Sequence, residues 1–175
     1  MHSKNKLFLL IFTVLIFAGL SYAKAELTVK GGVMASEFTT YGAGEIAIGF
    51  APESIPLAVE LSAMGLGYNY LETVIPFVNL RFDIDLGSLF TIYPIAGVGC
   101  NPYYYTGSPA GYTMGFAAKA GGGAMINITK FLSIRAEATY MHIENEWRQT
   151  IGWYAGQFFN EVGFVTGTAG LTAKF

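Results

Sequence analysis

Apolar and polar residues alternate along much of the chain. Between residues 132 and 140, the even-numbered positions are apolar and the odd-numbered positions are polar. Residues 78–86 repeat this scheme: the apolar positions are Val78, Leu80, Phe82, Ile84 and Leu86, and the polar ones are Asn79, Arg81, Asp83 and Asp85. A period of two residues is typical of a β-strand, whose successive side chains point to opposite faces. The pattern therefore predicts strands with one apolar and one polar face.

The same alternation in the rest of the chain predicts an all-β fold. The eight expected strands cover residues 26–35, 45–51, 57–66, 73–86, 90–100, 114–127, 131–142 and 161–175. The expected tight turns are residues 52–56, 87–89 and 128–130, and the expected longer loops are residues 36–44, 67–72, 101–113 and 143–160. Such alternation of short turns and long loops is typical of bacterial outer-membrane barrels. We therefore expect an eight-stranded antiparallel up-and-down transmembrane β-barrel.

Two prolines interrupt these expected strands. Pro76 and Pro94 each lack the backbone N–H group that a strand donates to its neighbour. We expect Pro76 to lie near a rim of the barrel, and the sequence offers no explanation for Pro94.

Charged residues share the polar face of the expected strands, and the opposite face carries essentially none. Five are cations and five are anions: Lys30, Glu45, Glu60, Arg81, Asp83, Asp85, Lys119, Arg135, Glu137 and Lys174. A lipid-facing Lys or Arg costs ~2–4 kcal/mol at the bilayer midplane, so exposing all five cations would cost on the order of 10 kcal/mol. We therefore expect the ten residues to point into the barrel, where opposite charges can pair in a packed polar core.

A soluble barrel of the lipocalin type is the alternative reading of the same alternation. In such a barrel the apolar face lines a ligand cavity and the charges face water. Ten outward charges would be few for a soluble protein of this length. The two readings differ in one observable feature, which is the direction in which the charged side chains point.

Residues 1–23 have the features of a secretory signal peptide. Two lysines precede 14 uncharged residues (7–20), which are followed by Ser21, Tyr22 and Ala23. At ~1.5 Å per residue, this apolar run is too short for a ~30 Å hydrocarbon core. We expect cleavage after Ala23, with Ala25 as the alternative, and residues 24–175 as one barrel domain.

Composition and charge exclude several other classes of protein. Charged residues make up 13% of the 175 residues, about half of the ~25% found in an average soluble domain. A net charge of −2 supplies no phosphate-binding patch, so we expect no nucleic-acid partner. Cys100 is the single cysteine, which leaves no internal disulfide, and it falls on the lipid-facing side of its expected strand.

The end of the chain resembles a known assembly signal. Thr168, Gly170, Ala173 and the terminal Phe175 follow the polar-x-Gly-x-x-apolar-x-aromatic pattern of outer-membrane proteins, although Ala173 is a weak apolar member of it. Residues 94–99 and 131–140 are similar to strands of OmpA/OmpX-like, opacity-type eight-stranded barrels. This resemblance implies an outer-membrane location in a diderm bacterium, contact with outer-membrane lipids, and recognition by the barrel assembly machinery.

Few residues are candidates for catalysis. His142 is followed two positions later by Glu144, where lipid A deacylases of barrel shape carry a serine nucleophile in a His-x-Ser pair. An enzyme of that kind would require His142 and Glu144 to converge with a hydroxyl such as Thr139 or Ser133. The sequence contains neither a metal-ligand cluster nor a phosphate-binding loop, so we expect no metal and no cofactor.

Aromatic residues gather around the third and fourth long loops. They are Tyr103, Tyr104, Tyr105, Tyr112, Trp147, Trp153, Tyr154, Phe158 and Phe159. They predict either an aromatic girdle at the membrane interface or an adhesive outer surface for a partner. We expect a non-enzymatic protein with a role in envelope structure, surface contact or adhesion, or limited solute passage. The alternatives are a lipid-modifying enzyme and a narrow channel or carrier for small apolar solutes.

Overall fold

The computed structural model describes residues 23–35, 40–52, 55–68, 71–105, 111–144 and 162–175. Nine strands are present among these residues, and none of the described segments forms a helix that is long and apolar enough to span a membrane. The strands are β1 (Ala23–Ala35), β2 (Thr40–Pro52), β3 (Leu57–Tyr68), β4 (Leu71–Phe82), β5 (Ile84–Asp85), β6 (Phe90–Tyr105), β7 (Gly111–Asn127), β8 (Leu132–Glu144) and β9 (Val162–Lys174).

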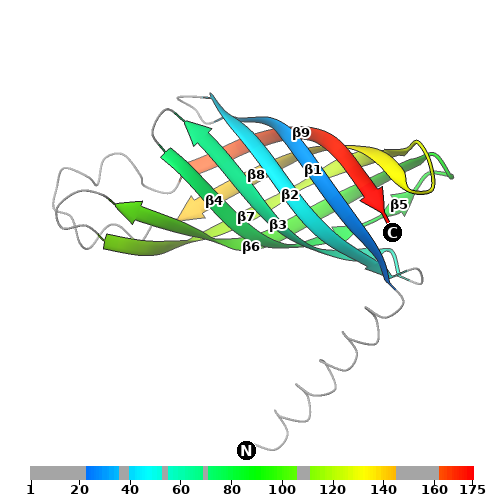
Figure 1. The fold of residues 1–175 in the computed structure, drawn as a ribbon, viewed down its shortest axis with the longest axis horizontal. Helices are drawn as coiled ribbons and strands as arrows, with labels where there is room; N and C mark the ends of the chain where they lie inside the picture. The colour runs from blue at the N-terminus through cyan, green and yellow to red at the C-terminus, as the bar shows by residue number, and fades with distance from the viewer. Residues whose placement is uncertain (1–22, 36–39, 53–54, 69–70, 106–110, 145–161) are drawn as a thin grey trace, which may run out of the picture.

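The strands form one closed antiparallel barrel (Figure 1). Strands that follow one another in sequence pair, except β4 and β5; β1 also pairs with β9, and β4 pairs with β6. The two-residue strand β5 continues the line of β4 and pairs with the beginning of β6, so the wall contains eight strands. This architecture confirms the predicted up-and-down barrel.

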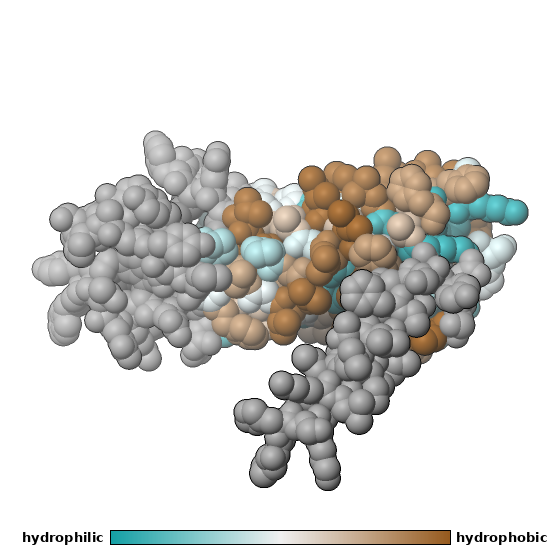
Figure 2. Space-filling model, turned by 60° about the horizontal axis from the view of Figure 1, so that its bottom comes forward, coloured by the Kyte–Doolittle hydropathy of each residue, from teal (hydrophilic) through white to brown (hydrophobic). Residues whose placement is uncertain are grey.

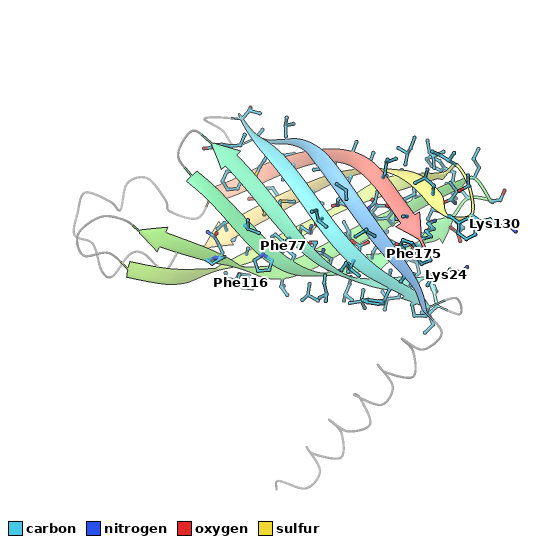
Figure 3. The ribbon with its side chains drawn as sticks, viewed as in Figure 1. Lys24, Phe77, Phe116, Lys130 and Phe175 are labelled. Carbon is cyan, nitrogen blue, oxygen red and sulfur yellow. The ribbon has the colours of Figure 1, made fainter. Side chains whose placement is uncertain are left out.

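The two ends of the barrel differ in the connections they carry. At one end, which we call the terminal end, lie both ends of the described chain and the turns that follow β2, β5 and β7 (Figure 1). The opposite end, which we call the loop end, carries the connections after β1, β3, β6 and β8. In Figure 3, Lys24, Lys130 and Phe175 lie at the terminal end.

Three of the expected long loops are shorter than predicted. The expected loop 36–44 is largely strand, because β2 begins at Thr40, and the expected loop 67–72 is reduced by the pairing of Tyr68 with Leu71. The expected loop 101–113 is also mostly strand, because β6 continues to Tyr105 and β7 begins at Gly111. Glycines hide the alternation in the first two segments: Gly42 pairs with Gly67, and Gly44 with Gly65. A glycine has no side chain to mark a face, so the sequence pattern ended before the strands did.

The direction of the side chains excludes the soluble-barrel alternative. Outward positions carry large apolar residues, such as Ile46 (56% exposed), Val78 (48%) and Leu80 (53%). The intervening positions point inward and are buried, among them Arg81 and Arg135, both 0% exposed. Figure 2 shows the resulting apolar surface on the described part of the wall.

The seam between β4 and β6 is short and lies between the two prolines. Its ladder has five residue pairs, from Phe77↔Gly99 to Arg81↔Ile95. Pro76 directly precedes Phe77, just beyond one end of this ladder. Pro94 directly precedes Ile95, just beyond the other end, next to the break between β4 and β5. Because proline cannot donate a ladder hydrogen bond, each proline stands where the pairing stops. This explains Pro94, and it places Pro76 at the end of a ladder rather than at a rim of the barrel.

Candidate functional site

Nine charged side chains form one continuous chain of ion pairs inside the barrel, which we call the ionic network. Its members are Glu26, Lys30, Glu45, Glu60, Arg81, Asp83, Lys119, Arg135 and Glu137. Strands β1, β2, β3, β4, β7 and β8 supply eight of them, and Asp83 lies between β4 and β5. The network therefore draws on most of the circumference of the barrel.

One half of the ionic network is organised around Lys30. Its amine lies 2.9 Å from Glu45 Oε2 and 3.0 Å from Glu137 Oε2. On the far side of Glu45, Lys119 Nζ donates to Glu45 Oε1 at 2.7 Å. Lys119 is on β7 and Glu45 is on β2, two strands that are not neighbours in the wall. This contact therefore crosses the lumen.

The other half is organised around Glu60 and two guanidinium groups. Arg135 Nη1 donates to Glu60 Oε1 at 2.6 Å and Nη2 donates to Glu137 Oε2 at 2.8 Å. Arg81 also binds Glu60, and it reaches Glu26 Oε2 at 2.8 Å and Asp83 Oδ1 at 2.6 Å. Glu60 thus joins β3 to both β4 and β8 across the interior.

Tyr93 of β6 lies between the two arginines. Its ring centroid is 4.8 Å from the Arg135 guanidinium carbon and 5.5 Å from that of Arg81, within the range of cation–π contacts. Arg135 Nε donates to the Tyr93 hydroxyl at 2.7 Å. Gly123 on β7 makes room for this ring, because a Cβ there would lie 2.3 Å from the Tyr93 hydroxyl.

The ionic network is buried in the barrel interior. Eight of its nine side chains are no more than 6% exposed, and Asp83 is 20% exposed. Removing ions from water is costly, and it is offset only where every charge has close partners of opposite sign. Each of the nine has at least one such partner within the network. The described interior is therefore occupied at this level by paired charged groups.

The structure brings together eight of the ten charged residues predicted from the sequence. Asp85 is exposed beyond the end of β4 and accepts a hydrogen bond from Thr91 at 2.6 Å, outside the network. Lys174, the last residue of β9, is half-buried and donates to Asn127 Oδ1 at 2.8 Å. Both lie too near the terminal end to reach the network. Glu26 was not among the predicted residues. It lies four positions before Lys30 on β1, so the two side chains point to the same face, and this spacing could have predicted it.

The loop-end part of the interior is apolar, which the sequence reading did not anticipate. We call this part the apolar cluster; its members are Met34, Ala43, Met64, Ile75, Phe77, Ala117, Met141 and Ile143. The Lys119 amine lies 4.9 Å from the Phe77 ring centroid, so these two residues mark the boundary with the ionic network. Counting every second residue of these strands onward from the last inward charged residue would have predicted the members of the cluster.

The residues of the resembled assembly signal lie along β9 and its end. Thr168 is buried, Ala173 pairs with Leu27 of β1, and the Phe175 N–H group donates to the Ala25 carbonyl at 2.8 Å. Gly170 allows β1 to approach, since a Cβ there would lie 1.9 Å from the Val29 carbonyl oxygen. These residues therefore close the barrel, and their recognition by an assembly machinery remains a prediction.

The structure separates His142 from the two hydroxyls that the sequence offers as its partners in a lipid-modifying enzyme. His142 is half-buried at an outward position of β8, paired with Ala118 and Gly163. Ser133 and Thr139 point inward, where they bond to Asn127 at 2.8 Å and Thr166 at 2.6 Å. Residues of opposite parity on one strand point to opposite faces, so these hydroxyls do not converge with His142.

The predicted aromatic residues divide between strand ends and residues outside the described ranges. Tyr103, Tyr104 and Tyr105 end β6, and Tyr112 of β7 pairs with Tyr104. Trp147, Trp153, Tyr154, Phe158 and Phe159 lie outside the described residues, as does most of the expected signal peptide. Cys100 is at an outward position of β6, as predicted, and is half-buried.

Comparison with solved structures finds barrels of the same architecture. Neisserial surface protein A is 14% identical, with a TM-score of 0.66 over 87% of this chain and 97% of that chain. A major outer membrane protein of Thermus thermophilus (14% identity, TM-score 0.60) and the N-terminal β-barrel domain of Pseudomonas aeruginosa OprF (14%, 0.57) also cover 87% of this chain, and 99% and 97% of their own. No protein-family model and no curated protein sequence matches the chain. At these identities the likeness shows a shared fold.

Proposed function

We propose that this chain, which has the fold of the eight-stranded outer-membrane barrels of the OmpA/OmpX type, is an integral outer-membrane protein with a closed, non-conducting barrel. The ionic network carries this proposal. A channel requires a continuous aqueous path, whereas the lumen here holds buried side chains that bind one another across its width. The barrel is therefore a scaffold rather than a pore.

The outer face supports the membrane location. Outward positions on all eight strands of the wall carry apolar side chains, including Val29 on β1, Ile134 on β8 and Leu171 on β9. Burial of such a surface in hydrocarbon is favourable by roughly 25 cal/mol per Å². A barrel with this exterior and a charged interior suits an apolar surrounding such as the membrane.

The role we assign to the scaffold is non-enzymatic. In an outer-membrane barrel the long loops face outward, so the loop end would lie at the cell surface. Tyr103, Tyr104, Tyr105 and Tyr112 flank one connection there, and aromatic residues are frequent in binding surfaces. Surface contact or adhesion, together with a contribution to envelope structure, is the function that this arrangement favours.

Conductance tests the closed barrel directly. The protein would be refolded in detergent, checked for a heat-dependent shift on an unboiled gel, and added to planar lipid bilayers. We expect no steady current from the natural sequence. The matched variant carries Glu60→Ala and Arg135→Ala, which removes one ion pair that crosses the lumen, and we expect it to conduct. Steady single-channel currents from the unaltered protein would refute the proposal.

A further inference from the structure

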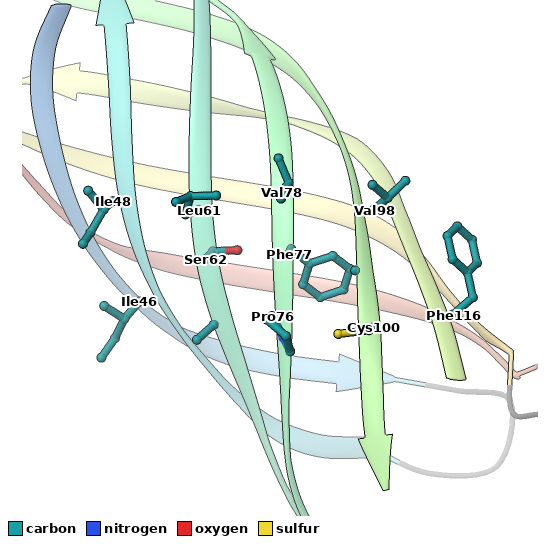
Figure 4. Close-up of a pocket in the computed structure, with 12 residues that line it drawn as sticks. Ile46, Ile48, Leu61, Ser62, Pro76, Phe77, Val78, Val98, Cys100 and Phe116 are labelled. Carbon is teal, nitrogen blue, oxygen red and sulfur yellow. The ribbon is translucent and has the colours of Figure 1, made fainter. Parts of the chain in front are cut away.

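An apolar groove runs across the outer wall where β3, β4 and β6 meet. Three small residues, Ala63, Pro76 and Cys100, lie side by side between the larger Ile46 and Phe116. The groove has a volume of about 700 Å³, within the ~300–1,000 Å³ typical of ligand pockets. Figure 4 shows Ile46, Pro76, Cys100 and Phe116 along this part of the wall. The groove is thus a hollow in the outer wall, lined at its centre by small residues.

The groove lies over the shortest seam between neighbouring strands of the wall. The β4–β6 ladder has five pairs, whereas the ladder between β6 and β7 has sixteen. Pro76 and Pro94 stop this ladder at its two ends because neither can donate a hydrogen bond. The seam therefore has few backbone bonds to break, and its open end coincides with the groove.

One aromatic side chain belongs both to the groove and to the interior. Phe77 points inward, is 2% exposed and belongs to the apolar cluster, yet it also lines the groove. Its partner across the seam is Gly99, where a Cβ would lie 2.8 Å from the Phe77 ring. Behind the ring lie three methionines of the cluster, and methionine is flexible enough to repack around an inserted group.

The groove also has the chemistry of the surrounding membrane. None of the described residues that line the groove carries a charge, and the groove continues the outward apolar face, where Ile46 is 56% exposed and Phe116 is 49% exposed. The occupant that fits such a surface is a hydrocarbon chain from the bilayer. The Ser62 hydroxyl offers little to a polar ligand, because Ser62 is 6% exposed and its oxygen accepts a hydrogen bond from Asn79 Nδ2 at 3.0 Å.

We propose that the β4–β6 seam is a lateral portal through which an alkyl chain of a membrane phospholipid reaches the apolar cluster. The chain lies in the groove, displaces the Phe77 ring and packs against Met64 and Met141, while its headgroup stays in the membrane. This inference rests on the proposed membrane location but not on the absence of conductance. It gives the barrel a lipid-binding site in the loop-end part of its interior, apart from the ionic network.

Photocrosslinking in vesicles tests the portal. The protein is refolded into phosphatidylcholine vesicles that contain a phospholipid with a diazirine near the end of one acyl chain. After illumination, adducts are located by mass spectrometry. We expect adducts both on groove residues, such as Cys100 and Phe116, and on Met64 and Met141 of the cluster.

A disulfide across the seam provides the decisive variant. In a Cys100→Ser background, Val78→Cys and Val98→Cys place two thiols on directly paired positions of β4 and β6. The control carries Ile48→Cys and Leu61→Cys, which are paired across the β2–β3 seam. We expect oxidation of the first pair to abolish the adducts on Met64 and Met141 and to leave those on Phe116. Reduction restores the cluster adducts, and oxidation of the control pair leaves them unchanged.

Three results would overturn the portal. Adducts on the groove without adducts on the cluster in the unlocked protein would show that the chain stays outside. Cluster adducts that persist when the β4–β6 seam is locked would show that it enters elsewhere. A lack of adducts at both places would show that this wall does not face lipid, and would refute the membrane location as well.

Discussion

The interior of the barrel contains two regions that share one inward face but differ in chemistry. Toward the loop end, Met64, Ile75 and Met141 belong to the apolar cluster and are fully or almost fully buried. Beyond Phe77, the same inward positions carry the ionic network. Strand β4 shows the change within a few residues, from Ile75 and Phe77 to Asn79 and Arg81. Alternation along a strand thus fixes which side chains point inward, but not what holds them together.

The two regions are stabilised by different interactions. In the ionic network, each group depends on the charges of its partners, so removing one member leaves its buried partners with less compensation. In the apolar cluster, packing decides stability, and a side chain of similar volume can replace another. Substitutions that break each region should therefore differ in size and in their tolerance of conservative change.

The largest effect is expected from Glu60→Leu. This change removes the carboxylate that Arg81 and Arg135 share, and breaking a buried ion pair in this way costs about 3–5 kcal/mol. The measurement is urea-induced unfolding in phospholipid vesicles. Asp85→Asn serves as the control, because Asp85 is exposed and outside the network; equal losses for the two variants would contradict the account.

A smaller effect is expected in the apolar cluster. Met141→Ala leaves a space at a position that is 0% exposed, and the expected loss is about 2 kcal/mol, at the low end for such changes because neighbouring methionines can repack. Met141→Leu should lose less than about 1.5 kcal/mol. If the leucine variant were as unstable as the alanine variant, volume would not be the property that matters there.

The seam between β4 and β6 should respond to added volume. Gly99→Ala places a Cβ 2.3 Å from the Pro76 carbonyl oxygen, and overpacking of this kind costs about 1 kcal/mol or somewhat more. Gly31→Ala is the matched control, since a Cβ at Gly31 meets nothing within 4 Å. Hydrogen exchange of the Val78 and Val98 amides should increase only in the first variant; unchanged exchange there would argue against strain at the seam.

The smallest effect is expected at the boundary between the two regions. A double-mutant cycle with Lys119→Met and Phe77→Leu isolates the contact between the Lys119 amine and the Phe77 ring, 4.9 Å apart. We expect a coupling energy of about 0.5–1 kcal/mol, the range of a cation–π contact. A coupling energy of zero in vesicle unfolding experiments would mean that the two regions meet without interacting.

Much of the architecture could be predicted from alternation alone. β8 and the inward direction of Arg81 and Arg135 were predicted, because charged and apolar side chains mark the two faces of a strand. The early start of β2 was not, because Gly42 and Gly44 mark neither face. Strand ends that are rich in glycine are therefore invisible to this pattern.

The chemistry of the site was only partly predictable. Alternation gives the inward set, but it does not say which members meet across the lumen, as Glu60 and Arg135 do. The structural role of Pro94 depends on how β6 pairs with β4 and β5, and this pairing is known only from the closed barrel. The apolar cluster was not predicted, because its residues carry no charge that distinguishes them from the outward apolar residues. They nevertheless occupy the same alternate positions of each strand as the charged residues do.

Contacts between acyl chains and methyl groups test the central claim most directly. Ile92, Ile95 and Val98 lie on one strand, β6, with exposed fractions of 37%, 3% and 54%. Nuclear Overhauser effects would be measured between lipid acyl protons and the methyl groups of the refolded, methyl-labelled protein in lipid nanodiscs. We predict cross-peaks from acyl chains to Ile92 and Val98 and none to Ile95. Cross-peaks to Ile95, with none to Ile92 and Val98, would show that the charged face looks outward and would contradict the account.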